Sequence, residues 1–145
     1  MSTDSDQTTP PLKWIEQPPT AFDIVTGYYP ESKPKAELRL RPCLVVGVLK
    51  GQTTGNLAIR IAYGTKNLKF VQRKDIDLII QNHSDLKAIG LPMATRFNLD
   101  ELIVLPWNQE NFGCWRGYRH PVIGRLTQDY IKDFAYSMMI RQSNS

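Results

Sequence analysis

The chain has 145 residues, of which 41% are hydrophobic and 22% are charged, and its formal net charge is +4. This length suits one domain with a buried core, and this composition excludes a disordered or fibrous chain. The sequence contains no run of the roughly 18 apolar residues that a membrane helix requires. Residues 1–9 also lack the basic and apolar regions of a secretory signal. We therefore expect a cytoplasmic protein with no membrane partner.

Potential metal ligands are few and scattered. The two cysteines, Cys43 and Cys114, and the two histidines, His83 and His120, do not have the close spacing of a zinc site. Two distant cysteines also form no disulfide framework and suit a reducing compartment. We therefore expect neither a bound metal nor another cofactor.

The basic residues are concentrated in one segment. From Lys33 to Lys74 there are ten basic residues and one acidic residue, Glu37, which gives a local net charge of +9. The remaining eight basic and thirteen acidic residues give a net charge of −5. A basic segment of this kind binds polyanions, because each phosphate that it neutralises releases counterions. The segment predicts contact with nucleic acid, although solvated lysines on strand faces would produce the same count.

The chain divides into a tail over residues 1–20, a domain over 21–141 and a disordered end over 142–145. The tail is rich in Ser, Thr, Asp, Gln and Pro, and it has few apolar residues to bury. Such a composition predicts a flexible segment.

In the first half of the domain, three strands are expected over 22–29, 38–49 and 57–63. Each has many β-branched or aromatic residues or alternates apolar with polar ones. A charged loop over 31–37 separates the first pair, and a Gly-containing turn over 50–55 separates the second pair. The second strand should begin half exposed and become buried, since it ends in a continuous apolar run.

A break over 64–67 follows, and short strands are then expected over 68–71 and 76–80. Residues 83–89 fit a short helical segment, which Gly90 would end. No internal repeat is visible in this part of the sequence or elsewhere.

The second half should contain strands over 94–99 and 102–105, interrupted by Asp100 and Glu101, and then a long loop over 106–121. Residues 122–126 lead into a final helix with Thr127 as its N-cap. The apolar positions of that helix have helical spacing and are 126, 130, 131, 134, 135, 138 and 139. Closely spaced strands before one helix predict a mainly β small barrel with an amphipathic C-terminal helix.

Four segments carry a family resemblance when they are taken in order. Residues 22–25 read Phe-Asp-Ile-Val, and residues 41–46, after a charged loop, read Arg-Pro-Cys-Leu-Val-Val. Residues 97–100 read Phe-Asn-Leu-Asp before an apolar strand, and residues 123–127 read Ile-Gly-Arg-Leu-Thr. This set resembles the PemK/MazF family of bacterial ribonuclease toxins, whose opening has the form G-D-I-V, charged loop, R-P-A-L-V-V, and whose last helix starts G-R-L-S. The resemblance covers residues 21–141.

The resemblance implies an SH3-like barrel that forms a homodimer. It also implies the toxin of a toxin-antitoxin system, a metal-independent endoribonuclease that cleaves single-stranded RNA such as mRNA and inhibits growth. A cognate antitoxin protein would neutralise it, and DNA binding would occur weakly and through the antitoxin complex.

The family's catalytic arginine, which stands before a proline, corresponds to Arg41. Its second catalytic position is a threonine or serine at the end of the third strand, and Thr65 is the nearest residue here. Where the family has Pro-x-Thr-Ser, residues 61–66 read Ile-Ala-Tyr-Gly-Thr-Lys. Thr65 would donate a hydrogen bond to a phosphate oxygen, while Glu37 or a histidine would accept the 2′-hydroxyl proton. Thr65 also suits an ordinary turn, and Glu37 a solvated loop.

Chemistry supports the assignment of Arg41 independently. In metal-free cleavage the 2′-hydroxyl attacks the phosphorus, and charge accumulates on the non-bridging oxygens. A guanidinium binds two such oxygens at once and keeps its proton at any accessible pH. We therefore expect Arg41 to stabilise the transition state electrostatically.

The RNA-binding residues are expected in the basic segment and are Lys35, Arg39, Arg60, Tyr63, Lys66 and Lys69. Unpaired bases stack on exposed aromatic rings, although core packing is the commoner fate of such rings. In the late loop, Trp107, Phe112 and Trp115 could cover the barrel, form a dimer contact or receive an antitoxin segment. The alternatives to a ribonuclease are a non-catalytic RNA-binding module and an SH3-like domain that binds an extended peptide.

Overall fold

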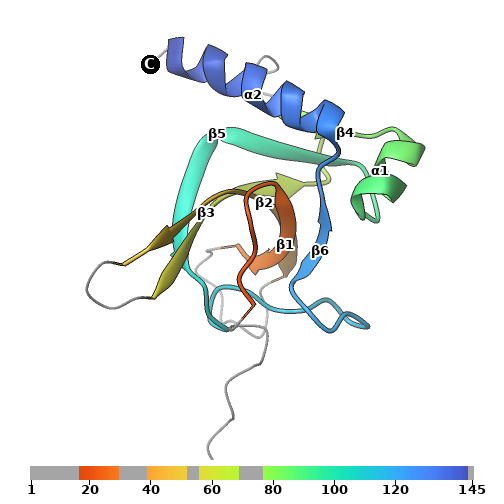
Figure 1. Cartoon of the computed structure of the whole chain (residues 1–145). Helices are drawn as coiled ribbons and strands as arrows, with labels where there is room; N and C mark the ends of the chain where they lie inside the picture. The colour runs from red at the N-terminus through yellow and green to blue at the C-terminus, as the bar shows by residue number, and fades with distance from the viewer. Residues whose placement is uncertain (1–16, 30–38, 52–55, 69–76, 144–145) are drawn as a thin grey trace, which may run out of the picture.

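The structure is a computed structural model that describes residues 17–29, 39–51, 56–68 and 77–143. Within these residues, six antiparallel strands form one curled sheet in the order β4-β5-β3-β2-β1-β6, accompanied by two helices (Figure 1). The elements are β1 (Asp23–Tyr28), β2 (Leu40–Lys50), β3 (Leu57–Thr65), β4 (Leu78–Ile80), α1 (His83–Ile89), β5 (Thr95–Pro106), β6 (Val122–Arg125) and α2 (Gln128–Ser143). The predicted fold class, a mainly β small barrel with a C-terminal helix, is confirmed. Among the described residues, no helix has the length and apolar character needed to cross a membrane.

The central strand β2 is buried on both faces, which explains its continuous apolar sequence. Leu44 belongs to a core cluster on the helix side of the sheet, whereas Cys43 and Val45 belong to a cluster on the other side. Successive residues of a strand point to opposite faces, so both sets have to be apolar. Burial ends before the strand does, since Val48 and Leu49 are each 40% exposed.

The cluster on the helix side holds α2 against the sheet. Figure 1 shows α2 lying across one open end of the curled sheet, with α1 beside it. Phe134 of α2 packs edge-on against Phe22, with ring centroids 5.4 Å apart. The Tyr130 hydroxyl donates to Asp85 of α1 at 2.7 Å, so the two helices are also joined to each other.

Strand β5 is continuous, where the sequence predicted separate strands over 94–99 and 102–105. The predicted interruption is instead an irregularity within one strand. Asn98 supports it, because its Oδ1 accepts the N–H of Asp100 and its Nδ2 donates to Glu101, both at 3.2 Å. The acidic residues thus mark a bend and not the end of a strand.

The bend shifts the register between β5 and β3. Ala62 faces Leu102, whereas Gly64 faces Phe97, so more residues lie on β5 than on β3 between these two pairs. The extra residues turn β5 so that its first half also pairs with β4, where Phe97 faces Leu78. The sheet curls at this point.

Two expectations for the end of the chain need correction. Residues 122–125, expected only as an approach to the helix, form β6, which pairs with β1. On α2, Met139 is 65% exposed while Ser137 is buried, although the apolar spacing included the former and not the latter. The contact stripe follows Phe134, Ser137 and Met138, which are three and four residues apart and therefore share a face.

The short helix α1 matches its prediction. Its bounds are His83–Ile89, Asn82 caps its N-terminus by accepting the N–H groups of Ser84 and Asp85, and Gly90 follows it with a φ of 99°. Glycine adopts this left-handed conformation without a steric cost.

Some predictions concern residues outside the described ones. These are the tail apart from residues 17–20, the charged loop over 31–37, most of the turn over 50–55 and nearly all of the strand expected over 68–71. Helix α2 runs through Ser143, two residues into the end that was expected to be disordered.

Gly64 allows three strands to approach one another closely. A Cβ at this position would lie 2.8 Å from the carbonyl oxygen of Pro42 on β2 and 2.8 and 2.9 Å from side-chain atoms of Thr95 and Phe97 on β5. The Pro42 contact is to backbone, which cannot rotate away. Glycine is therefore required where β2, β3 and β5 meet.

We predict that Gly64→Ala lowers the free energy of unfolding by about 1–3 kcal/mol, the usual cost of overpacking. Gly47→Ala is the matched control, because nothing lies within 4 Å of a Cβ built at Gly47 of β2. Urea unfolding of both variants measures the difference. Equal stability of Gly64→Ala and the wild type would contradict the close approach.

Candidate functional site

Two adjoining pockets lie among the described residues at the junction of β2, β3 and β5, with volumes of about 550 and 200 Å³. Arg41, Gly64 and Thr65 line both of them. The two pockets are therefore lobes of one cleft that meet at the residue pair for which the sequence predicted catalysis.

The end of a strand ladder brings Arg41 and Thr65 together. Strands β2 and β3 pair from Cys43, which faces Tyr63, and not before it. The preceding residue, Pro42, has no N–H with which to continue the ladder. Arg41 and Thr65 lie just beyond this point, and both side chains border the cleft.

Aromatic rings fix the guanidinium of Arg41. Its central carbon lies 4.2 Å from the centre of the Tyr29 ring, a cation–π contact. Tyr29 packs edge-on against Tyr63 with centroids 5.0 Å apart, and the Tyr63 hydroxyl donates to the carbonyl of Tyr28 at 2.7 Å. Burial raises the pKa of Tyr63, and the nearby Cys43 and Tyr29 add to this effect while Arg41 opposes it. Tyr63 thus remains a neutral donor.

Thr65 is the last residue of β3, so the predicted break over 64–67 begins later than expected. Its Oγ1 accepts the backbone N–H of Asn67 at 3.1 Å. This bond occupies a lone pair and leaves the hydroxyl hydrogen available to donate. A side chain that accepts from the residue two positions on is typical of the first residue of a turn, so the turn and the orientation of the hydroxyl depend on each other.

A buried ion pair supports that turn. Arg96 of β5 donates through Nη1 to Asp77 at 2.9 Å and through Nε to the carbonyl of Asn67 at 3.3 Å. The Asp77 side chain is 2% exposed. Burial raises the pKa of Asp77, whereas its hydrogen bond and charge contact with Arg96 lower it. Arg96 lines the smaller lobe, and its charge is engaged in holding the segment after Thr65.

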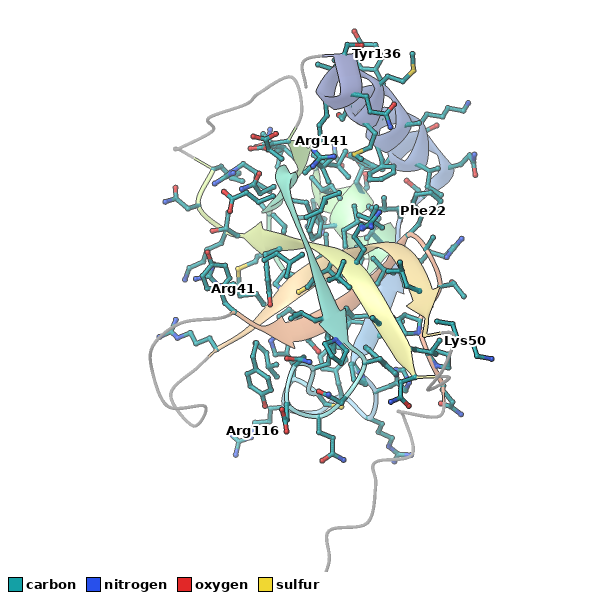
Figure 2. All side chains as sticks on the ribbon, turned by 90° about the vertical axis from the view of Figure 1, so that its left-hand side faces the viewer. Phe22, Arg41, Lys50, Arg116, Tyr136 and Arg141 are labelled. Carbon is teal, nitrogen blue, oxygen red and sulfur yellow. The ribbon has the colours of Figure 1, made fainter. Side chains whose placement is uncertain are left out.

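The larger lobe is basic and partly apolar. Four basic side chains line it, from Arg39, Arg41, Lys66 and Arg116, and none of the described residues in its lining is acidic. Its apolar wall includes Met93, which is 51% exposed, and Trp115. Figure 2 shows Arg41 and Arg116 on one side of the barrel, with Lys50 on the other.

The long loop over 107–121 is fixed to β1. Tyr28 donates its N–H to the carbonyl of Asn111 at 2.9 Å, and Gly113 donates to the carbonyl of Thr26 at 3.2 Å. Thr26 in turn donates its N–H to Pro121 at 3.0 Å. The loop that carries Trp115 and Arg116 is therefore attached to the sheet at several points.

The structure places the predicted residues unevenly. Arg39 and Lys66 line the larger lobe and Tyr63 the smaller one. Arg60 is exposed on β3 and lines neither lobe, because the side chains of a strand alternate between faces. The predicted residues outside the described ones are Lys35, Glu37 and Lys69.

Other candidates lie away from the cleft or cover the core. His83 is exposed on α1, and His120 lies in the late loop; neither lines a lobe. Trp107 and Phe112 are 5% and 1% exposed, so of the roles considered for them, covering the barrel is the one observed.

The sequence reasoning did not select Met93, Arg96, Glu101 or Arg116, which also line the lobes. Glu101 was expected merely to separate two strands, whereas it borders the smaller lobe. The signal that could have found Arg116 is its position beside Trp115 in a long loop, since a basic residue next to an aromatic one is common in nucleic-acid interfaces.

Fold and cleft together define a small β barrel with a basic, aromatic-flanked groove at the end of a strand ladder. No protein-family model matches the chain, and no curated protein matches it significantly. Among the described residues, no group of three or more His, Cys, Asp or Glu side chains is placed to hold a metal ion.

We predict that Tyr63→Phe lowers the free energy of unfolding by about 0.5–1.5 kcal/mol, because it removes the hydrogen bond to Tyr28 while keeping the ring. Tyr136→Phe is the control, since Tyr136 is 65% exposed on α2. Thermal unfolding of the two variants measures the effect. Equal stability of both would mean that the Tyr63 hydroxyl contributes nothing to the end of the barrel.

Proposed function

We propose that this protein is a metal-independent endoribonuclease of the PemK/MazF type that cleaves single-stranded RNA in the cleft between β2 and β3. The observation that carries the proposal is that Arg41 and Thr65, selected from the sequence for chemistry at a phosphate, line both lobes of the same basic cleft. A scissile phosphate at their junction would leave one lobe for the nucleotide on each side.

Arg41 supplies the electrostatic stabilisation. As the 2′-oxygen bonds to phosphorus and the bond to the 5′-oxygen breaks, negative charge gathers on the non-bridging oxygens. Guanidinium donors held in place before the reaction stabilise that charge without reorganising. The stacking of Arg41 on Tyr29 limits the orientations of its plane.

Thr65 donates the second hydrogen bond to the phosphate. Its acceptor lone pair is engaged with Asn67, so its proton points elsewhere. The product ends would be a 2′,3′-cyclic phosphate and a 5′-hydroxyl, because the neighbouring 2′-oxygen and not water is the nucleophile.

Glu101 is our candidate for the group that accepts the 2′-hydroxyl proton. It lines the smaller lobe together with Arg41 and Thr65, and its Oε1 is oriented by the amide of Asn98 at 3.2 Å. Glu37, the acid selected from the sequence, is the alternative. A carboxylate is a common general base when it lies within reach of the proton.

The backbone at Phe22 lends the resemblance support of a different kind. Phe22 has a φ of 76°, a left-handed conformation that is uncommon for residues other than glycine. The family's opening strand has the form G-D-I-V, and its glycine aligns with Phe22. Phe22 therefore holds a conformation that glycine adopts more readily, at the position where the family's opening has its glycine.

The partners follow from the resemblance alone. We propose a homodimer, an antitoxin protein that neutralises the activity, and the cytoplasm as the compartment where mRNA is met.

The first test is cleavage of a single-stranded RNA pool in EDTA with analysis of the fragment ends. We predict that the wild type produces cyclic-phosphate and 5′-hydroxyl ends, and that Arg41→Ala and Thr65→Val each slow cleavage by about 10²- to 10³-fold, the usual loss for one such donor. Arg41→Lys should not restore the rate, because lysine has no planar, bidentate fork.

Arg141→Ala is the matched control, since it removes the same charge from α2 at a distance from Arg41 (Figure 2). Its cleavage rate should equal that of the wild type. Cleavage by Arg41→Ala at the wild-type rate would refute the site. Salt-sensitive RNA binding without any cleavage would instead favour the non-catalytic RNA-binding module.

The proton acceptor has a test of its own. We predict that Glu101→Gln slows cleavage by about 10²- to 10⁴-fold, because an amide cannot accept the 2′-hydroxyl proton. Glu110→Gln, in the exposed part of the late loop, serves as the control. If Glu101→Gln cleaves at the wild-type rate and Glu37→Gln does not, then Glu37 is the base.

A further inference from the structure

The larger lobe contains a group that phosphate chemistry does not use. Trp115 lines the lobe together with the basic residues, and its indole N–H donates to the carbonyl of Leu40 at 3.1 Å. Tyr118 packs edge-on against it with centroids 5.9 Å apart. A solvent-accessible tryptophan held by a hydrogen bond and a second ring is an oriented apolar surface.

The size of the lobe and its wall fit a flat apolar ligand. About 550 Å³ is within the range of small-ligand pockets. Met93 lies in the same wall, 51% exposed, and its flexible thioether adapts to ligands of different shape. Pro92 and Pro42 add rigid apolar surface.

The charges indicate what kind of ligand carries this flat group. Arg39 and Lys66 lie in the lining on the strand side, and Arg116 follows Trp115 directly on the loop side. None of the described lining residues is acidic. A ligand that joins a flat apolar ring to an anion fits this lining, and a nucleobase attached to a phosphodiester chain is such a ligand.

We propose that Trp115 is a base-stacking residue, and that the larger lobe binds one unpaired base of a single-stranded RNA next to the phosphate held by Arg41. The inference rests on the proposed function for the position of that phosphate. The inference extends the proposed function by assigning a specificity-determining subsite to the long loop over 107–121, outside the basic segment. Met93 and Arg116 complete the subsite, on the segment before β5 and in the loop respectively.

The test measures binding without cleavage. A 2′-fluoro RNA oligonucleotide lacks the nucleophile, so its affinity is independent of catalysis. One base at a time is removed to leave an abasic position, and the dissociation constants of the wild type and Trp115→Ala are measured by fluorescence anisotropy. For the wild type, we expect removal of one particular base to weaken binding by about 5- to 100-fold.

For Trp115→Ala, removal of that same base should change the affinity by about twofold or less, because its stacking partner is already absent. Trp115→Phe, which keeps a ring but not the N–H, should retain the dependence on that base. Tyr136→Ala, which removes an exposed aromatic side chain from α2, should behave as the wild type does.

Three outcomes would overturn the inference. They are a base dependence in Trp115→Ala equal to that of the wild type, equal affinity of the wild type for intact and abasic oligonucleotides, and no binding by the wild type. The second would mean that the lobe accepts only the phosphate chain or another anionic polymer. Absence of RNA cleavage together with a base dependence tied to Trp115 would refute the ribonuclease while leaving the stacking site in place.

Discussion

Strands β2 and β3 approach each other closely at Pro42 and Gly64, and this contact determines where the cleft lies. Pro42 ends the ladder because it lacks an N–H, and Gly64 lets the carbonyl of Pro42 come near because it lacks a side chain. If the ladder continued, β2 and β3 would be hydrogen-bonded to each other at the position that the cleft occupies. Because it stops, the residues on either side of this point, Arg41 and Thr65, border an open space. The same junction receives β5, whose bend beside Tyr63 keeps the smaller lobe next to the larger one.

Strand β2 contributes residues both to the lining of the cleft and to the core of the barrel. Its middle fills both core clusters, so it cannot shift along its neighbours without moving apolar side chains to the wrong face. Its first residue, Leu40, accepts the indole N–H of Trp115. Arg41 follows directly and stacks on Tyr29, the residue after β1. The strand register therefore fixes the guanidinium and the tryptophan relative to each other, although the two residues are far apart in the sequence.

The sequence predicted what depends on local pattern. Patterns among neighbouring residues predicted the strands on either side of the turn over 50–55 and the short helix that ends before Gly90. They also singled out Arg41, which stands before a proline. The continuity of β5 was not predicted, because Asp100 and Glu101 give the sequence of a turn while the tertiary pairing with β3 keeps the strand intact. The sequence also did not predict the cleft wall formed by Met93, Trp115 and Arg116. The late loop is positioned by hydrogen bonds to β1, which no spacing rule predicts. Arg60 belongs to the basic segment, but strand alternation directs its side chain away from the cleft, so its predicted contact with RNA would lie outside the two lobes.

The contact between Arg41 and Tyr29 links the folding of the barrel to the orientation of the Arg41 guanidinium. A guanidinium carries all its N–H donors in one plane, so a ring stacked on one face of that plane restricts its orientation without itself using any of those donors. The plane is fixed when the barrel folds, because Tyr29 packs on Tyr63 and Tyr63 is bonded to the backbone of β1. The entropy of orienting the arginine is thus lost on folding and not when a phosphate arrives, which is the condition under which hydrogen-bond donors stabilise a transition state most effectively. A lysine ammonium at the same position would keep the charge and lose that preorganisation.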